Sequence, residues 1–178
     1  MHLRIISGTH RGRRIVAPKS LPVRPTTDYA KESLFNILNN QLDLDGIQAL
    51  DLFSGTGNIS FELASRGAAS VVAVDMNPKC CSFAKEQAIE FGFENIRTIK
   101  SNVFPFLKGM GGKYNLIFAD PPYDLETTNT LPGIIFEKGL LTEDGVLIIE
   151  HGRETDLSLC DHFVEKRTYG NVNFSIFR

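Results

Sequence analysis

The sequence predicts an α/β protein whose mostly parallel β-sheet is covered by helices on both faces. From residue 47 onward, short runs rich in Val, Ile and Leu alternate five times with segments of helical character. Strands that are buried on both faces have this near-continuous apolar character. Near the end of the chain, two alternating segments flank Gly170-Asn171 and predict a β-hairpin with at least one antiparallel strand. We therefore expect a sheet of seven strands.

The beginning of the chain has a different character. Residues 3–7 and 14–17 read as short strands around a glycine-flanked turn, which predicts a small N-terminal β-hairpin. Residues 18–25 contain three prolines and predict a stiff, extended linker. The 178 residues suit one domain with at most a small appendage. We expect residues 1–26 to form a head and linker, and residues 27–178 to form the main domain.

Capping residues mark the ends of the predicted helices. Thr27 suits the N-cap of a helix through about Asn40. Asn77 and Pro78 combine an N-cap with proline at the first helical position, and Gly92 ends that helix. The apolar stripe of the first helix would be Ala30, Leu34, Phe35 and Leu38. The other helices are expected over residues 59–66, 103–109 and 127–138, and the strands over residues 47–53, 70–74, 96–100, 114–119, 145–150, 162–168 and 172–177.

The net charge of −2 hides an asymmetry along the chain. The first forty residues carry seven Lys or Arg against two acidic residues, while the remainder carries 12 basic against 19 acidic residues. A basic head on an acidic body predicts that the head contacts a polyanion, and a solvated charged face is the alternative. The seven are Arg4, Arg11, Arg13, Arg14, Lys19, Arg24 and Lys31.

Several classes of protein are not expected from the composition. The three cysteines form no C-x-x-C pair and the four histidines show no ligand spacing, so we expect neither a disulfide framework nor a metal site. No apolar run approaches the roughly 20 residues that span a bilayer, and the first residues lack the apolar core of a signal peptide. We expect a cytoplasmic protein that does not enter membranes.

The tetrapeptide Asp120-Pro121-Pro122-Tyr123 follows the predicted strand 114–119. The prolines cannot donate a backbone hydrogen bond, and they hold the preceding residue extended at the carboxyl end of the strand. Open α/β sheets bind ligands at this edge. A carboxylate, a carbonyl group and an aromatic ring would then lie close together, which suits a planar base with an exocyclic amine. A proline-rich turn without function is the alternative.

A glycine-containing loop follows the first strand of the sheet, between Asp51 and the next helix. Gly55 and Gly57 would let a ligand approach the backbone closely. Ser60 occupies the place of the third glycine in the dinucleotide fingerprint, and the loop lacks the lysine of a P-loop. NAD, FAD and nucleoside triphosphates are therefore not favoured.

Polar residues end the next two strands at the same edge. Asp75 is placed to accept hydrogen bonds from both hydroxyl groups of a ribose, and Asn102 is placed to meet an adenine. Met76 could lie against the adenine face. The structural alternatives are a solvated acid at a turn for Asp75, a loop cap for Asn102 and core filling for Met76.

Together, these motifs resemble the class I S-adenosylmethionine-dependent methyltransferases with a (D/N)-P-P-(Y/F) motif, which act on amino groups. The resemblance covers residues 47–178 and implies a Rossmann-like fold, S-adenosylmethionine as cofactor and S-adenosylhomocysteine as product. It implies that Asp120, Pro121 and Tyr123 are catalytic. It also implies that the cofactor contacts Asp51, Phe53, Gly55, Gly57, Asp75, Met76, Asn102 and Val103.

The head narrows the resemblance to the bacterial RsmD-type family, which methylates N2 of one guanine in 16S ribosomal RNA. The segments that carry it are residues 5–8, 11–14, 21–28 and 32–36. It implies a monomer that acts on 16S rRNA, within the small ribosomal subunit or an assembly intermediate. The candidate RNA contacts are Arg11, Arg13, Arg14, Arg24, Pro122 and Tyr123.

Three other functions remain open at this point. A DNA adenine-N6 or cytosine-N4 methyltransferase shares the motif, but no segment here is long enough for a target-recognition domain. A protein glutamine methyltransferase usually has Asn at the position of Asp120 and lacks an arginine-rich head. A non-catalytic RNA-binding module would not need the intact motif beside an intact cofactor loop.

Overall fold

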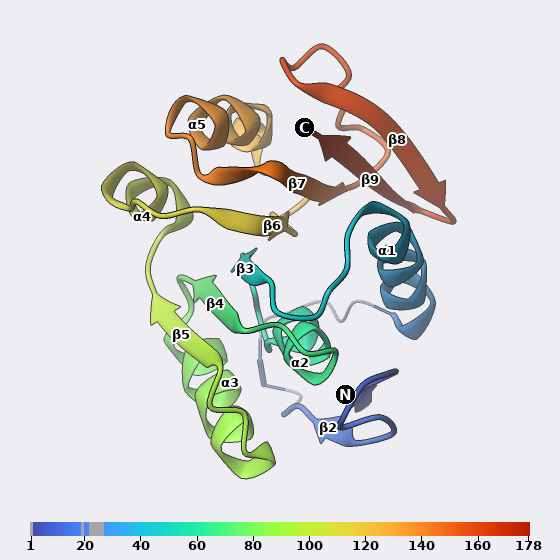
Figure 1. The fold of residues 1–178 in the computed structure, drawn as a ribbon, viewed down its shortest axis with the longest axis vertical. Helices are drawn as coiled ribbons and strands as arrows, with labels where there is room; N and C mark the ends of the chain where they lie inside the picture. The colour runs from blue at the N-terminus through green and yellow to red at the C-terminus, as the bar shows by residue number, and fades with distance from the viewer. Residues whose placement is uncertain (1, 19, 22–26) are drawn as a thin grey trace.

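A seven-stranded mixed sheet forms the centre of the computed structural model, which describes residues 2–18, 20–21 and 27–178 (Figure 1). The strands lie in the order β5-β4-β3-β6-β7-β9-β8. The first five strands of this order are parallel, and β9 is antiparallel to both of its neighbours. The predicted fold class and the C-terminal hairpin are therefore confirmed. The strands are β3 (Gln48–Leu52), β4 (Ser70–Asp75), β5 (Ile96–Lys100), β6 (Tyr114–Ala119), β7 (Leu141–His151), β8 (Phe163–Tyr169) and β9 (Val172–Phe177).

Helices cover both faces of the sheet (Figure 1). One face packs against α1 (Asp28–Gln41), α2 (Asn58–Ser65) and α3 (Pro78–Phe91), and the other against α4 (Val103–Gly109) and α5 (Leu131–Glu137). Each apolar layer excludes water from its face of the sheet, and this burial is the main favourable contribution to folding. In the described part of the chain, no helix has the length and apolar character to span a bilayer.

The predicted helix ends are confirmed where capping residues specify them. The Thr27 hydroxyl accepts a hydrogen bond from the Ala30 amide at 3.1 Å. The Asn77 carboxamide caps α3, and Gly92 ends this helix with a left-handed φ of 73°. These ends depend on local chemistry, which explains why the sequence specifies them.

Within residues 27–178, two predicted elements differ from the structure by more than one residue at an end. The helix expected over residues 127–138 is a 3₁₀ turn, η1 (Glu126–Thr130), followed by α5, because Pro132 is accommodated only in the first turn of an α-helix. The strand expected over residues 145–150 is β7, which begins at Leu141. Its register against β6 shifts between Tyr114 and Leu116, and this irregularity hides the start of the strand in the sequence.

The N-terminal head forms the predicted hairpin, from β1 (His2–Arg4) and β2 (Arg14–Val16). Its first strand ends at Arg4 and not at residue 7 as predicted. Its turn packs on the end of α2. The Thr9 amide donates to the Ser65 carbonyl at 2.8 Å, and a Cβ on Gly8 would collide with the same oxygen. The His10 ring lies 4.2 Å from the Phe93 ring, centroid to centroid. Most of the linker predicted over residues 18–25 lies outside the described residues.

A buried ionic cluster, which the sequence analysis missed, connects this head to the main domain. The Glu62 carboxylate of α2 has no exposed surface and accepts hydrogen bonds from the Ile6 and Ser7 amides at 2.8 and 3.0 Å. It pairs with Arg66 at 2.8 Å and with Lys31 of α1 at 3.3 Å. Burial lowers the pKa of Lys31, and the Glu62 charge opposes this shift.

Replacing Glu62 with Gln should destabilise the protein by about 3–5 kcal/mol, because it leaves the buried Lys31 and the partly buried Arg66 without a countercharge. Urea unfolding followed by circular dichroism measures this loss. Glu137→Gln, at an exposed position on α5, is the matched control and should change the stability by less than about 0.5 kcal/mol. Equal stabilities for the two variants would contradict the anchoring role of Glu62.

Candidate active site

The predicted cofactor loop and the Asp-Pro-Pro-Tyr segment meet at one point of the sheet edge. Strand β3 lies between β4 and β6, so that Leu52 pairs with both Val74 and Ala119. The Asp120 amide continues this pairing and donates to the Leu52 carbonyl at 3.2 Å, while the Ser54 amide donates to the Val74 carbonyl at 3.0 Å. The direction of chain crossovers reverses here, and open α/β sheets bind ligands at such points.

The loop after β3 is a tight turn in which every second residue from 53 to 57 has a positive φ. Phe53, Gly55 and Gly57 have φ of 59°, 53° and 81°. A Cβ on Gly57 would lie 3.1 Å from the Phe61 ring, so the glycine is required both by its φ and by close packing. The loop therefore presents backbone rather than side chains to the edge of the sheet.

Asp75 holds this loop from the neighbouring strand. One carboxylate oxygen accepts from the Gly55 amide and the other from the Asn77 amide, both at 2.8 Å. Because each carboxylate oxygen can accept more than one hydrogen bond, the half-buried group can still bind the hydroxyl groups of a ribose. The structure thus places Asp75 beside the predicted cofactor loop and gives it a structural role as well.

Asp51 lies in β3, buried behind the loop, and does not reach the exposed surface of the loop. Its side chain is almost completely buried and accepts a hydrogen bond of 2.5 Å from the Ser60 hydroxyl. Burial raises the pKa of Asp51 to about 7, although the bond from Ser60 opposes this shift. Ser60, which replaces the third glycine of the dinucleotide fingerprint, therefore supports the loop through Asp51.

The residues predicted to meet the adenine lie at the ends of β4 and β5. Met76 is 68% exposed, which disagrees with core filling. The Asn102 side-chain oxygen caps α4 by accepting from the Phe104 amide at 3.0 Å, so its loop-cap role is present, and the residue is exposed. Val103 is buried. The Phe53 and Phe104 rings pack edge to face at 6.5 Å between the two loops.

Two buried polar atoms at the loop have no hydrogen-bond partner among the described residues: the Ser54 hydroxyl and the Asn58 side-chain nitrogen. Buried polar groups without a partner are rare in native proteins and often lie at functional sites. The carboxylate and ribose of S-adenosylmethionine offer acceptors and donors of the required kind. The residues of the loop therefore fit this cofactor. The sequence analysis named neither Ser54 nor Asn58 as a contact.

In the Asp-Pro-Pro-Tyr segment, Asp120 is half-buried, Pro121 is buried and Pro122 is exposed. The Tyr123 side chain is 38% exposed, and its hydroxyl donates to Glu150 Oε1 at 3.2 Å. Glu150 was not among the predicted site residues. An acid at the end of a parallel strand is the same signal that identified Asp75, so the sequence contained the information.

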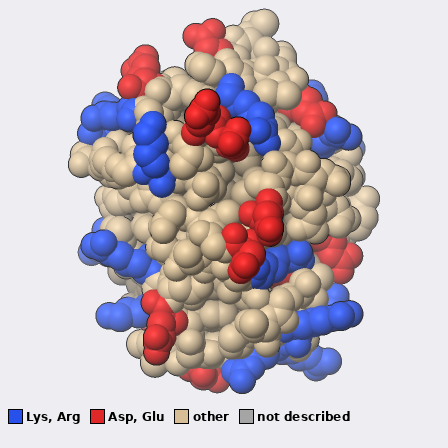
Figure 2. Space-filling model, viewed as in Figure 1, with Lys and Arg blue, Asp and Glu red and all other residues tan. Residues whose placement is uncertain are grey.

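Some cations of the first forty residues pair with acidic residues of the same chain. Arg4 pairs with acidic residues of α1, and Lys31 is buried against Glu62. Arg11, Arg13 and Arg14 are exposed, and the Arg13 guanidinium lies 5.0 Å from the centre of the Phe91 ring. Figure 2 shows basic side chains towards the lower end of the molecule, where Figure 1 places the hairpin. Lys19 and Arg24 lie outside the described residues.

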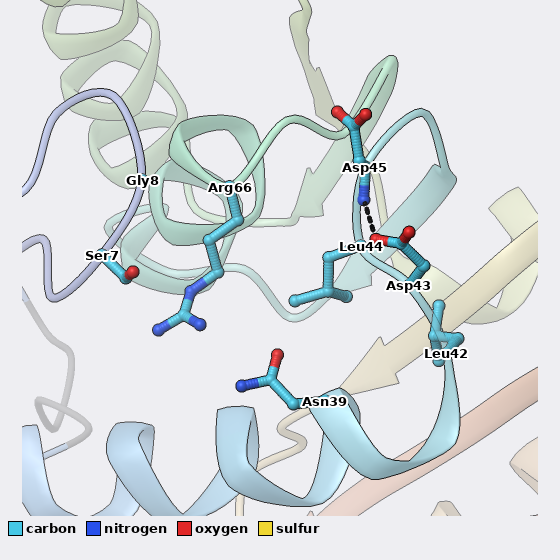
Figure 3. Close-up of a pocket in the computed structure, with 8 residues that line it drawn as sticks. All are labelled: Ser7, Gly8, Asn39, Leu42, Asp43, Leu44, Asp45 and Arg66. Carbon is cyan, nitrogen blue, oxygen red and sulfur yellow. Dashed lines mark hydrogen bonds between the residues drawn. The ribbon is translucent and has the colours of Figure 1, made fainter.

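A cavity of about 550 Å³ lies at the opposite, amino-terminal edge of the sheet. It is bordered by the loop before β3 and by the end of α2 (Figure 3). The Arg66 guanidinium and the Asn39 amide point into it, while the Asp45 carboxylate points away. The cavity is therefore separate from the predicted active site. Among the described residues, no cluster of His, Cys, Asp and Glu could hold a metal ion.

Replacing Asp51 with Asn should make the folded protein less sensitive to pH. Between pH 4 and 7 the unfolded chain releases the Asp51 proton while the folded state retains it, so this group's contribution to stability falls as pH rises. The free energy of unfolding of Asp51→Asn, relative to that of the wild type, should rise by about 2 kcal/mol between about pH 5 and pH 8. Urea unfolding at both pH values measures it, and parallel profiles would contradict the raised pKa.

Comparisons with known proteins agree with this geometry. The family model described as "Conserved hypothetical protein 95" matches residues 3–178. The Bacillus subtilis "Putative rRNA methyltransferase YlbH" is 32% identical, over 99% of this chain and 98% of its own length. The Escherichia coli "Ribosomal RNA small subunit methyltransferase D" is also 32% identical, over 87% of this chain and 77% of its own length.

Solved structures show the same fold over the whole chain. The "Putative methyltransferase yhhF" from Escherichia coli has a TM-score of 0.87 at 26% identity and covers 99% of this chain and 97% of its own. A hypothetical protein from Thermus thermophilus has a TM-score of 0.85 at 27% identity, with 99% of both chains covered. S-adenosylmethionine is the cofactor of this fold class, as the sequence predicted. The chain therefore belongs to the RsmD family of class I S-adenosylmethionine-dependent methyltransferases.

Proposed function

We propose that this protein transfers a methyl group from S-adenosylmethionine to the exocyclic N2 amine of a guanine in 16S ribosomal RNA, at the position numbered 966. The observation that carries the proposal is the junction of Asp120 with Leu52, which brings the acceptor-binding segment beside the cofactor loop. The names of the relatives support ribosomal RNA as the substrate class. The arginine-rich hairpin supports a polyanionic substrate.

The reaction needs alignment more than it needs a strong base. The cofactor supplies an electrophilic methyl group on a sulfonium sulfur. Holding the guanine nitrogen in line with that methyl group turns a bimolecular step into an effectively unimolecular one, worth up to about 7–11 kcal/mol. The attacking nitrogen becomes acidic only after transfer, so Asp120 need not remove its proton beforehand.

The Asp-Pro-Pro-Tyr segment supplies the groups that hold the guanine. The Asp120 carboxylate and the Pro121 carbonyl accept hydrogen bonds from the amine, which favours a pyramidal nitrogen and stabilises positive charge as it develops. Tyr123 stacks on the base, worth about 1–3 kcal/mol. Pro122 is exposed beside it and forms part of the same surface.

On the cofactor side, Asp75 binds the ribose, and Asn102 and Met76 contact the adenine. Gly55 and Gly57 let the methionine part approach the backbone, and the cofactor also contacts Phe53 in the same loop, Asp51 in β3 and Val103 at the start of α4. The Gly55–Asp75 hydrogen bond supports these roles, because it fixes the loop against the strand that carries the ribose acid.

The head, residues 1–26, contacts the RNA through Arg11, Arg13, Arg14 and Arg24, and residues 27–178 form the methyltransferase domain. Phosphate contacts position a substrate without reading its sequence, so the target guanine is selected by RNA shape and by the extruded base. We propose that a monomer acts in the cytoplasm on the small ribosomal subunit or an assembly intermediate. Labelled methyl transfer to particles, naked rRNA, DNA and protein, with nucleoside analysis, tests the substrate class.

Replacing Asp120 with Ala should lower methyl transfer by about 10²–10³-fold, because the developing charge on nitrogen loses its carboxylate partner. Calorimetry should show unchanged binding of S-adenosylmethionine. Asp124→Ala, at an exposed position in the same loop, is the matched control. Near-normal turnover of the Asp120 variant would exclude the proposed role.

Replacing Arg11, Arg13 and Arg14 together with Ala should weaken RNA binding and reduce its salt dependence. Loss of three phosphate contacts with single-stranded RNA would change the slope of log K against log salt by about 2. Replacing the exposed Lys108, Lys113 and Lys138 is the matched control. An unchanged affinity and slope in the arginine variant would show that the head is not the RNA contact.

A further inference from the structure

The Tyr123 ring is held from two sides by residues 150–152, which span the end of β7 and the residue after it. A Cβ on Gly152 would lie 3.0 Å from Tyr123 Cδ2 and 3.3 Å from Cγ, so the ring packs directly on the glycine. The hydroxyl at the other end of the ring donates to Glu150 Oε1 at 3.2 Å. Contacts at both ends of the ring restrict its tilt, although more than a third of the side chain is exposed.

The segment itself is fixed by the C-terminal hairpin. The Gly152 carbonyl accepts from the Asn173 side-chain amide at 3.1 Å and from His151 Nδ1 at 2.9 Å. Asn173 in turn accepts from the Thr168 hydroxyl at 2.7 Å. His151 Nε2 lies 2.8 Å from the Ser175 hydroxyl. Since a carbonyl oxygen only accepts, Nδ1 carries the proton of this buried ring, and Nε2 accepts from Ser175.

These contacts form a continuous connection from the hairpin to the ring. Burial lowers the pKa of His151, which keeps the ring neutral and preserves both of its hydrogen bonds. Polar groups that are buried and fully paired hold a local structure rigidly. The position of Tyr123 therefore depends on β9, which lies far from Asp120 in the sequence.

We propose that Gly152 and Glu150 are positioning residues that set the plane of the Tyr123 ring for the target base, and that the C-terminal hairpin fixes both of them. This inference rests on the stacking role proposed for Tyr123. The ring packs against Gly152, which has no side chain in the way, and Glu150 holds the hydroxyl end of the ring. An aromatic plate aligned before binding places the base more accurately than a freely rotating one.

Gly152→Ala tests the packing contact. Gly152 has no positive φ, so Ala is compatible with the backbone, and its methyl group should displace the half-exposed ring by a few tenths of an ångström. We expect kcat/KM for the RNA to fall about 10-fold, with unchanged affinity for S-adenosylmethionine. In a Tyr123→Ala background the same substitution should have no further effect. Equal losses in both backgrounds would overturn the proposal.

Gly133→Ala is the matched control, because a Cβ there meets no atom within 4 Å and its φ is not positive. It should leave activity unchanged in both backgrounds. Glu150→Leu tests the hydroxyl contact. The factor by which it lowers kcat/KM for the RNA should be at least about 3-fold smaller in a Tyr123→Phe background than in the wild type. If Glu150→Leu lowered kcat/KM by the same factor in both backgrounds, Glu150 would not act through Tyr123.

A spectroscopic measurement separates this inference from the proposed function. With 3-fluorotyrosine incorporated at the four tyrosines, the ¹⁹F resonance that Tyr123→Phe removes belongs to Tyr123. Gly152→Ala and Glu150→Leu should shift it, whereas Gly133→Ala should not. An unshifted resonance overturns the positioning role whatever the enzyme methylates. Failure of the wild type to methylate rRNA, with the resonance shifted, contradicts only the proposed function.

Discussion

The buried carboxylate of Glu62 is the interaction on which the arrangement of the head, the first helix and the cofactor loop depends. A buried charge is tolerated only when it is paired and hydrogen-bonded, and Glu62 meets this requirement with groups from three separate segments. Lys31 also donates to Asn58, the first residue of α2, at 2.9 Å. One ionic cluster therefore connects the proposed RNA-binding hairpin with the helix that follows the glycine loop.

The same cluster changes how the basic head is interpreted. The total charge of the first forty residues includes cations that pair with acidic residues of the chain, such as Arg4 and Lys31, and the exposed cations of the hairpin turn. Arg4 and Lys31 satisfy acidic partners within the chain, whereas Arg11, Arg13 and Arg14 are exposed around the hairpin turn. A local concentration of like charge is more favourable for binding a polyanion than the same charge spread over a surface. The exposed arginines of the turn therefore suit the proposed RNA contact better than Arg4 and Lys31 do.

The two halves of the sheet hold different parts of the candidate site at its carboxyl edge. Strands β3 and β4 hold the glycine loop and Asp75, while β6 and β7 hold the Asp-Pro-Pro-Tyr segment and Glu150. The halves meet where Asp120 pairs with Leu52, so the distance between the proposed cofactor and acceptor sites is set by a backbone hydrogen bond of the sheet. Because strand pairing is rigid, this arrangement provides alignment without side-chain motion.

The alternation of strands and helices and the capped helix ends were predictable from the sequence, because each depends on local chemistry. The carboxyl ends of the predicted strands also nominated most of the candidate site residues. The pairing of the polar groups was visible only in the folded chain. Glu62 and Lys31 look like ordinary surface residues of amphipathic helices, yet both are fully buried. Gly152 contacts Tyr123 and Asn173 contacts Gly152, although these residues belong to segments that are distant in the sequence. Pairing across such distances depends on how the elements pack, and no short pattern of residues records it.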